Sequence, residues 1–441
     1  MLLLAKVKDV APIATLSKLS ILRYGARDNT PAKASRSHTT GVQQQSHGGQ
    51  LPPEIVQIIY TFVIPDMQTL ASCARTCRAW SDSTVELLYT DVRPSSEVTC
   101  ELLARTLEAG STNDLARRVK SLRLPGPDST NERRKTFPSS FARILRRTYN
   151  LTKLSVRVQA SDDPVDMLGQ LFDAARGCPL LRSLTITFNR RAGFHDAMWS
   201  LDGILRVLAH YALRHLTSLS LSNFLFSYGH NLPKKEAKKT MPPIANLRLR
   251  NIFAFGSLDD PISALLYALR GSLNCVDLQL GNRALTSDKT FEPVAGRMTR
   301  LRFDGGALGE PSFARLTALT HLRVRLHVLT SIAPSDIPPL LHTLVIDQQI
   351  LKLTTLAGSS HPLMVLWRYL GQVAPVVGQL KQMVVCIAAK ESQKELVRAA
   401  AVYWAVEGDK IGLQVQTRLE FAGGRFDRVP RWPDPPVGRL L

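Results

Sequence analysis

Apolar and polar residues alternate in a series of short segments along the middle of the chain. Residues 151–156 read Leu-Thr-Lys-Leu-Ser-Val, and residues 319–324 read Leu-Thr-His-Leu-Arg-Val. Alternation with period two is the pattern of a strand that is buried on one face. Nine such segments recur at spacings of 21 to 35 residues, with these positions equivalent: Leu122, Leu154, Leu184, Leu219, Leu247, Val276, Leu301, Leu322 and Leu344.

The segments between these strands have the spacing of amphipathic helices. Apolar residues recur at three and four positions, as on one face of a helix, within 141–145, 167–172, 204–211 and 262–269. Strand, turn, helix and return, when repeated, stack into a solenoid with a parallel concave sheet and outer helices. We therefore expect an α/β fold with a solenoid over 116–350 and a closing repeat or cap over 351–420.

The motif L-x-x-L-x-L in each unit makes residues 116–350 resemble leucine-rich repeats, here an irregular horseshoe. Two features depart from that family: the asparagine after the strand stands one position early at Asn223 and Asn251, and the early units exceed the usual period. An ordinary α/β domain with leucine-rich strands is the alternative.

A different pattern precedes the repeats, at 51–95. Helical spacing of apolar residues predicts one helix from Pro53 to Pro65, a second from Asp66 to Trp80 and a third near 85–89. Three short helices make a core that is marginal alone and gains from a partner.

Several residues of this segment match a known signature. Leu51-Pro52-x-Glu54-Ile55, the turn Pro65-Asp66 and Cys77-Arg78-x-Trp80 resemble an F-box, although Ala74 and Thr76 stand where that family has Leu or Val. The resemblance implies binding to a Skp-type adaptor protein and, through it, to a cullin-RING ubiquitin ligase. The expected adaptor-binding residues are Leu51, Pro52, Ile55, Ile58 and Ile59. The alternative is that these residues pack against the protein's own repeats.

The chain is strongly basic. Its 441 residues include 56 Lys and Arg against 36 Asp and Glu, a net charge of +20 that is supplied by 1–50, 117–157 and 231–250. Such a field favours an acidic protein surface, nucleic acid or an anionic membrane. We expect disordered tails at 1–50, which is basic, and at 421–441, which is rich in Pro and Arg. Residues 1–36 leave open a role as a targeting segment.

Motifs of catalysis are missing from the sequence. It contains no G-x-S-x-G, no G-x-x-x-x-G-K, no G-x-G-x-x-G and no H-E-x-x-H. The six cysteines are dispersed without a CxxC pair, which favours reduced thiols in the cytoplasm or nucleus. We expect neither an enzyme nor a metal or other cofactor, and no apolar run reads as a membrane span.

Arginine dominates the positions that flank the inward leucines, and these positions face the concave side if the leucines face the helices. Neighbouring guanidinium groups repel one another unless an anionic ligand or carboxylates such as Asp277 and Asp304 compensate. We therefore expect an acidic or phosphorylated protein substrate to bind at Arg157, Arg248, Arg250, Arg302, Arg323 and Arg325. The alternative is a solvated strand surface.

These features together predict the substrate-recognition adaptor of an SCF-type cullin-RING ubiquitin ligase. The F-box would bind the Skp-type adaptor and the repeats would bind the substrate. The alternative is a basic scaffold that binds nucleic acid or another polyanion and has a degenerate F-box. Nucleic acid is disfavoured as a partner because the basic regions contain few aromatic residues for base stacking.

Overall fold

The protein is described from a computed structural model. It covers residues 67–73, 78–109, 113–126, 137–159, 164–189, 198–223, 225–227, 241–254, 257–280, 285, 287–305, 313–349, 368–369, 371–372, 378–390 and 394–422. The chain divides into two compact units, Met1–Ile59 and Tyr60–Leu441, and every described residue belongs to the second.

One parallel sheet of twelve strands runs through this unit in the order β1-β2-β3-β4-β6-β8-β10-β11-β12-β13-β14-β15. The strands are β1 (Asp91–Val92), β2 (Ser121–Leu124), β3 (Lys153–Gln159), β4 (Ser183–Asn189), β6 (Ser218–Ser222), β8 (Asn246–Arg250), β10 (Cys275–Gln279), β11 (Arg300–Asp304), β12 (His321–Arg325), β13 (Thr343–Gln349), β14 (Gln382–Lys390) and β15 (Gln414–Ala422). A second parallel sheet joins the short strands β5 (Met198–Ser200), β7 (Leu225–Ser227) and β9 (Phe253–Ala254).

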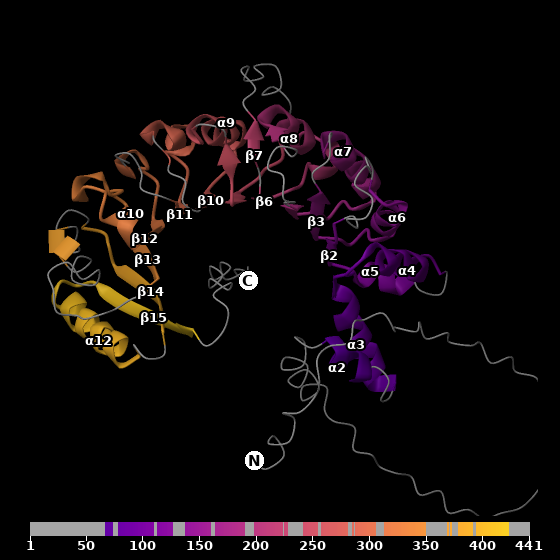
Figure 1. Ribbon diagram of the computed structural model, residues 1–441, viewed down its shortest axis with the longest axis horizontal. Coiled ribbons are helices and arrows are strands. Elements are labelled where there is room, and N and C mark those ends of the chain that lie inside the picture. The colour runs from indigo at the N-terminus through magenta and orange to yellow at the C-terminus, as the bar shows by residue number, and fades with distance from the viewer. Residues whose placement is uncertain are drawn as a thin grey trace, which may run out of the picture. The chain divides into compact units, whose positions relative to one another are not determined.

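Helices connect successive strands and lie on the outer side of the large sheet, while its strands line the inner side (Figure 1). The α-helices are α2 (Met67–Cys73), α3 (Arg78–Thr90), α4 (Glu97–Glu108), α5 (Asn113–Arg118), α6 (Ser139–Arg147), α7 (Pro164–Ala174), α8 (Leu201–Leu208), α9 (Asp259–Leu269), α10 (Leu326–Leu329) and α12 (Lys394–Lys410). The 3-10 helices are η2 (Ala175–Gly177), η3 (Tyr211–Leu213), η5 (Asp288–Val294), η6 (Phe313–Arg315) and η7 (Pro334–Asp336).

The predicted solenoid is confirmed, including its register. All nine positions taken as equivalent are buried and lie side by side on neighbouring strands, from Leu122 opposite Leu154 to Leu322 opposite Leu344. Because side chains alternate across a strand, this leucine row packs against the helices and its neighbours face the other way. The fold is thus an α/β solenoid of leucine-rich-repeat type.

Helices shorten along the solenoid as the repeats shorten. The long early units contain α6, α7, α8 and α9 at the predicted places, whereas the last connections before β13 contain mainly η5, η6 and η7. A 3-10 helix rises about 2.0 Å per residue against about 1.5 Å in an α-helix, so it covers the return path with fewer residues. Within 351–420, where a closing repeat or cap is expected, the structure has β14 and α12.

Several elements differ from the sequence-based expectation. α4, α5 and β15 were not predicted, and β15 extends through Phe421 and Ala422, which we had assigned to the tail. The predicted second and third helices correspond to α2 and α3, but Trp80 lies in α3 rather than at the end of the second helix. The first predicted helix of the F-box lies outside the described residues.

The displaced asparagines form a ladder between repeats. Asn223 and Asn251 have left-handed φ values of 62° and 49°. Asn251 Nδ2 donates to Asn223 Oδ1 at 3.1 Å, and Asn223 Nδ2 donates to the carbonyl of Phe188 at 3.1 Å. Although both asparagines stand one position early, they still link the ends of successive strands. Asparagine is suited to this position because its short polar side chain tolerates a left-handed backbone.

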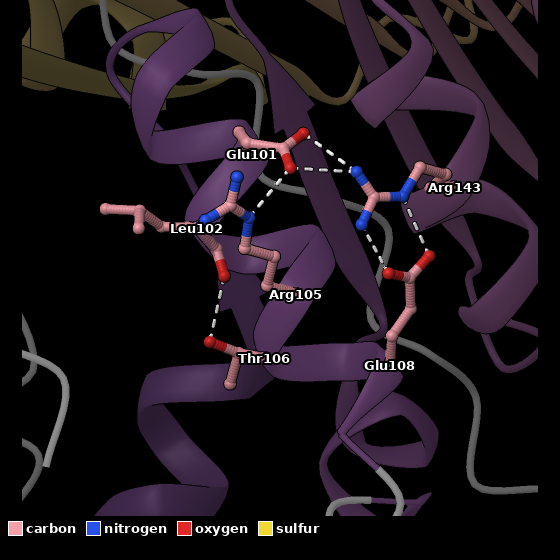
Figure 2. A network of polar contacts seen from close by, with 6 residues as sticks. All are labelled: Glu101, Leu102, Arg105, Thr106, Glu108 and Arg143. Atoms are coloured by element: carbon pink, nitrogen blue, oxygen red, sulfur yellow. Dashed lines mark hydrogen bonds and ion pairs between the residues drawn. The ribbon is translucent and has the colours of Figure 1, made fainter. Parts of the chain in front are cut away.

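A polar clasp joins the helices at the start of the solenoid. Figure 2 shows Arg143 of α6 between two carboxylates of α4. Its guanidinium donates to Glu101 at 2.9 Å and, through Nε, to Glu108 at 2.8 Å. These hydrogen bonds lower the pKa of both carboxyl groups and raise the pKa of Arg143. Arg143 therefore links α6 to two positions on α4, through Nη1 to Glu101 and through Nε and Nη2 to Glu108.

Candidate binding face

The candidate site lies on the polar face of the sheet, which we define as the side away from the helices. Its central row follows the leucine row by one residue and carries Arg248 on β8, Asp277 on β10, Arg302 on β11 and Arg323 on β12, each directly opposite the next. We call these four residues, together with Asp304, Arg325 and Asp347 in the next row along the strands, the Arg–Asp ladder. Parallel pairing in one register brings residues from five separate repeats into these two rows.

Carboxylates within the ladder hold most of its guanidinium groups. Arg248 Nε donates to Asp277 Oδ2 at 2.6 Å. Arg323 donates through Nε and Nη2 to Asp347 at 2.7 and 2.8 Å, in a bidentate pair. One row further along the strands, Arg325 forms an ion pair with Asp304. The expected interleaving of carboxylates is therefore present.

Arg302 lies between these pairs and differs from them. Its nearest carboxylate oxygens are Asp277 Oδ1, 3.8 Å from Nε, and Asp347 Oδ2, 3.7 Å from Nη2. Both distances exceed hydrogen-bond length. The side chain is only 4% exposed, and its buried Nε has no hydrogen-bond partner.

The pKa of Arg302 shifts in the opposite direction to the pKa of Arg323, the neighbouring arginine in the same row. Burial lowers the pKa of Arg302, and the attraction of Asp277 and Asp347 does not offset that effect. Burial acts in the same direction on the pKa of Arg323, but its hydrogen bonds and charge contact with Asp347 outweigh it and leave that pKa raised. Arginine stays protonated in proteins, so Arg302 is a buried cation without a carboxylate of its own.

The structure brings five of the six predicted substrate-binding residues together. Arg248, Arg250, Arg302, Arg323 and Arg325 lie on β8, β11 and β12, whereas the exposed Arg157 lies on β3 with β4 and β6 between. Those two intervening strands contain no acidic residue and present Ser and Thr on the polar face. Arg157 is thus separate from the ladder.

Accessibility also divides the set. Arg302 and Arg323 are buried, while the side chains of Arg248 and Arg325 are each 34% exposed. A partner that binds this face would therefore contact Arg248 and Arg325 before it reaches the buried Arg302 and Arg323.

Asp347 is a residue of the candidate site that was not expected from the sequence. It pairs with Arg323 and approaches Arg302, yet only Asp277 and Asp304 were expected as compensating carboxylates. The signal was available, because Asp347 follows Leu344 by three residues as Asp304 follows Leu301. Equal offsets from the leucine row place side chains in one row.

The other sequence-based sites have mixed outcomes. The expected adaptor-binding residues Leu51, Pro52, Ile55, Ile58 and Ile59 lie outside the described residues. Within the ranges that the structure describes, no three His, Cys, Asp or Glu side chains gather as a metal site would require. The described cysteines form no disulfide, and no described helix is long and apolar enough to cross a membrane.

Comparison with known proteins adds little to this geometry. No protein-family model matches the chain, and no curated protein matches it. The chain is similar to a chain in the crystal structure of the yeast Rad7 and Elc1 complex, with 13% identity, 75% of this chain and 92% of that chain covered, and a TM-score of 0.23. At so low a TM-score the two structures do not superpose as wholes.

Proposed function

We propose that the protein is the substrate-recognition adaptor of an SCF-type cullin-RING ubiquitin ligase. The observation that supports a receptor role is the Arg–Asp ladder, two rows of charged side chains on the polar face of a parallel sheet, in which Arg248 and Arg325 are partly exposed. Among the described residues of this face, Arg248, Arg302, Arg323 and Arg325 lie beside three carboxylates, Asp277, Asp304 and Asp347, so this cluster keeps one positive charge. A surface of that kind suits an acidic segment of another protein.

The connection to a ligase rests on the F-box resemblance of 51–95. In this proposal the F-box binds the Skp-type adaptor, and the ladder holds a substrate near the activated ubiquitin. Catalysis belongs to other subunits, and this chain acts by proximity. Holding two reactants together raises their effective concentration without any new chemistry.

Adaptor binding is tested with the full chain. Purified Skp-type adaptor is expected to co-elute with it in size-exclusion chromatography, and Ile55→Asp with Ile58→Asp is expected to abolish co-elution because both residues belong to the predicted apolar contact. Gln57→Asp, between them on the other side of the predicted helix, is the matched control and keeps the complex. Absence of a complex with the unaltered chain would refute the ligase part of the proposal.

Substrate binding is tested by reversing charge where the ladder is accessible. Arg248→Glu with Arg325→Glu is expected to remove co-purifying partners while adaptor binding persists. These two residues are chosen because Arg302 and Arg323 are buried, so reversal there would also disturb folding. Arg182→Glu, at an exposed position before β4, is the control. Unchanged partner recovery would count against the ladder as the receptor site.

A basic scaffold for nucleic acid is the second candidate, and one observation favours it. Cations are exposed along the edge where the early strands begin, at Arg117, Lys120, Lys153, Arg182 and Arg214. That function predicts tight binding to unrelated DNA duplexes with a steep dependence on salt. Weak binding with a shallow salt slope would remove it.

A further inference from the structure

The charges of the ladder do not balance at one position. Asp277 is hydrogen-bonded to Arg248, Asp347 is hydrogen-bonded to Arg323, and Asp304 pairs with Arg325. Each carboxylate near the centre therefore already has a guanidinium at close range. Arg302 lies among them with contacts no shorter than 3.7 Å.

An unbalanced buried charge is costly for a folded protein. Taking an ion out of water is unfavourable unless hydrogen bonds and an opposite charge replace the water. Among the described residues Arg302 has neither at close range, and the lowered pKa of its guanidinium, caused first by burial, agrees with the geometry. A dianion placed over Arg302 would supply both.

We propose that Arg302 forms the floor of a site for a single phosphoryl group carried by a protein side chain, with Arg248 and Arg325 at its rim. This inference rests on the proposed receptor function and names its ligand. A phosphoryl group carries a charge near −2 and three acceptor oxygens, and a planar guanidinium fork matches that geometry. The partly exposed rim residues can turn toward the ligand because each already has a third of its side chain in solvent.

Local chemistry favours one phosphoryl group over other anions. A carboxylate of a substrate would bring only one charge, the same as Asp277 and Asp347, and would have to compete with them for the guanidinium groups. The backbone of a nucleic acid would place several phosphates along the row and meet Asp277, Asp304 and Asp347 as well. Like charges at close range oppose that arrangement.

The test uses the full chain and inorganic phosphate as the probe, at constant ionic strength set with chloride. Phosphate is expected to raise the Tm of the unaltered protein because a ligand that binds only the folded state stabilises it. Arg302→Met is expected to abolish the Tm shift and to weaken phosphate at least about tenfold in calorimetry, which is the loss of one charge-assisted hydrogen bond. Arg302→Lys keeps the charge but loses the fork, so its affinity falls between the two.

Lys289→Met is the control, because it removes one exposed positive charge outside both the ladder and the cationic strand edge and should leave the phosphate shift unchanged. A second arm compares the peptide Gly-Gly-phosphoserine-Gly-Gly with the same peptide bearing glutamate. The phosphorylated peptide is expected to bind at least about tenfold more tightly, and only when Arg302 is present.

Three results would overturn the inference: no phosphate shift in the unaltered protein, an equal shift in Arg302→Met, or an RNA oligonucleotide that binds better than the phosphopeptide through Arg302. The first of these, found together with partner capture that still depends on Arg248 and Arg325, would leave the receptor function standing. Loss of that capture dependence would refute the receptor function separately.

Discussion

Two arginines in the same row and with the same burial should respond in opposite ways to the same substitution. Arg302 and Arg323 are on neighbouring strands, directly opposite each other, and each side chain is 4% exposed. We expect Arg323→Met to destabilise the fold and Arg302→Met to leave it unchanged or make it more stable. Methionine preserves most of the apolar stem in both variants, so the comparison isolates the guanidinium.

The magnitude follows from the contacts that each guanidinium makes. Arg323 loses two charge-assisted hydrogen bonds, at 2.7 and 2.8 Å, which contribute about 1.5–3 kcal/mol each. Arg302, only 3.7 Å from Asp347, can take over part of that carboxylate, so we expect a net loss of about 3 kcal/mol, at the low end for breaking a buried ion pair. Arg302→Met breaks no hydrogen bond, and replacing a buried ion by an apolar group is neutral or stabilising by about 1–4 kcal/mol.

The assay is urea unfolding followed by far-UV circular dichroism at pH 7, in a buffer without phosphate. The free energies of unfolding of the two variants should differ by at least about 3 kcal/mol, with Arg302→Met the more stable. Arg182→Met, at an exposed position, should lie within about 0.5 kcal/mol of the unaltered protein. Equal destabilisation of the two ladder variants, or a larger loss for Arg302→Met, would refute the account of the ladder.

Three further predictions concern other parts of the fold. Asn251→Gly should lower the free energy of unfolding by about 1 kcal/mol through the lost side-chain hydrogen bond. Asn251→Ala should lower it by about 1–2 kcal/mol more, because the left-handed backbone at this position is unfavourable for alanine. Thermal unfolding compares the two variants, and a more stable alanine variant would contradict this account. Arg143 lowers the pKa of Glu101 and Glu108, so their contribution is complete above the unfolded-state pKa of about 4.3 and is lost as pH falls through the lower folded-state values. The Tm should therefore fall more steeply between pH 5 and pH 3 in the unaltered protein than in Arg143→Met, and parallel curves would contradict the clasp. Burial raises the pKa of the Cys178 thiol to about 11, so this thiol should react with Ellman's reagent only after unfolding. Mass spectrometry identifies which cysteine has reacted. Rapid reaction of Cys178 in the native protein would contradict its packing.

The repeated leucines alone determined the architecture. Leu122 and its equivalents are separated by different numbers of residues, yet each stands at the same place in an alternating segment, and in the structure they form one buried row. Burial of one strand face leaves a single favourable register, since a slip by one residue would turn every leucine toward solvent. Local pattern was therefore sufficient for the nine strands of the leucine row, the early helices and the face on which the arginines lie.

β15 and α4 were not predicted, for different reasons. β15 does carry a period-two pattern, with Val415, Leu419 and Phe421 alternating with polar residues, and it pairs with β14 over its whole length. α4 and α5 precede the first repeat, and α4 is anchored by the clasp between Glu101, Glu108 and Arg143. Neither partner is near in sequence.

The pairing of charges was decided only by the folded sheet. Arg302 and Arg323 both follow an inward leucine on a short strand, and nothing local distinguishes them. Each meets side chains of two neighbouring strands that come from other repeats, so Asp347 bonds Arg323 and lies beyond hydrogen-bond length from Arg302. Burial of the leucine row depends on a pattern within each strand, which can be read directly from the sequence. Ion pairs across the parallel sheet join residues that are a whole repeat apart, so the sequence does not show which charges pair.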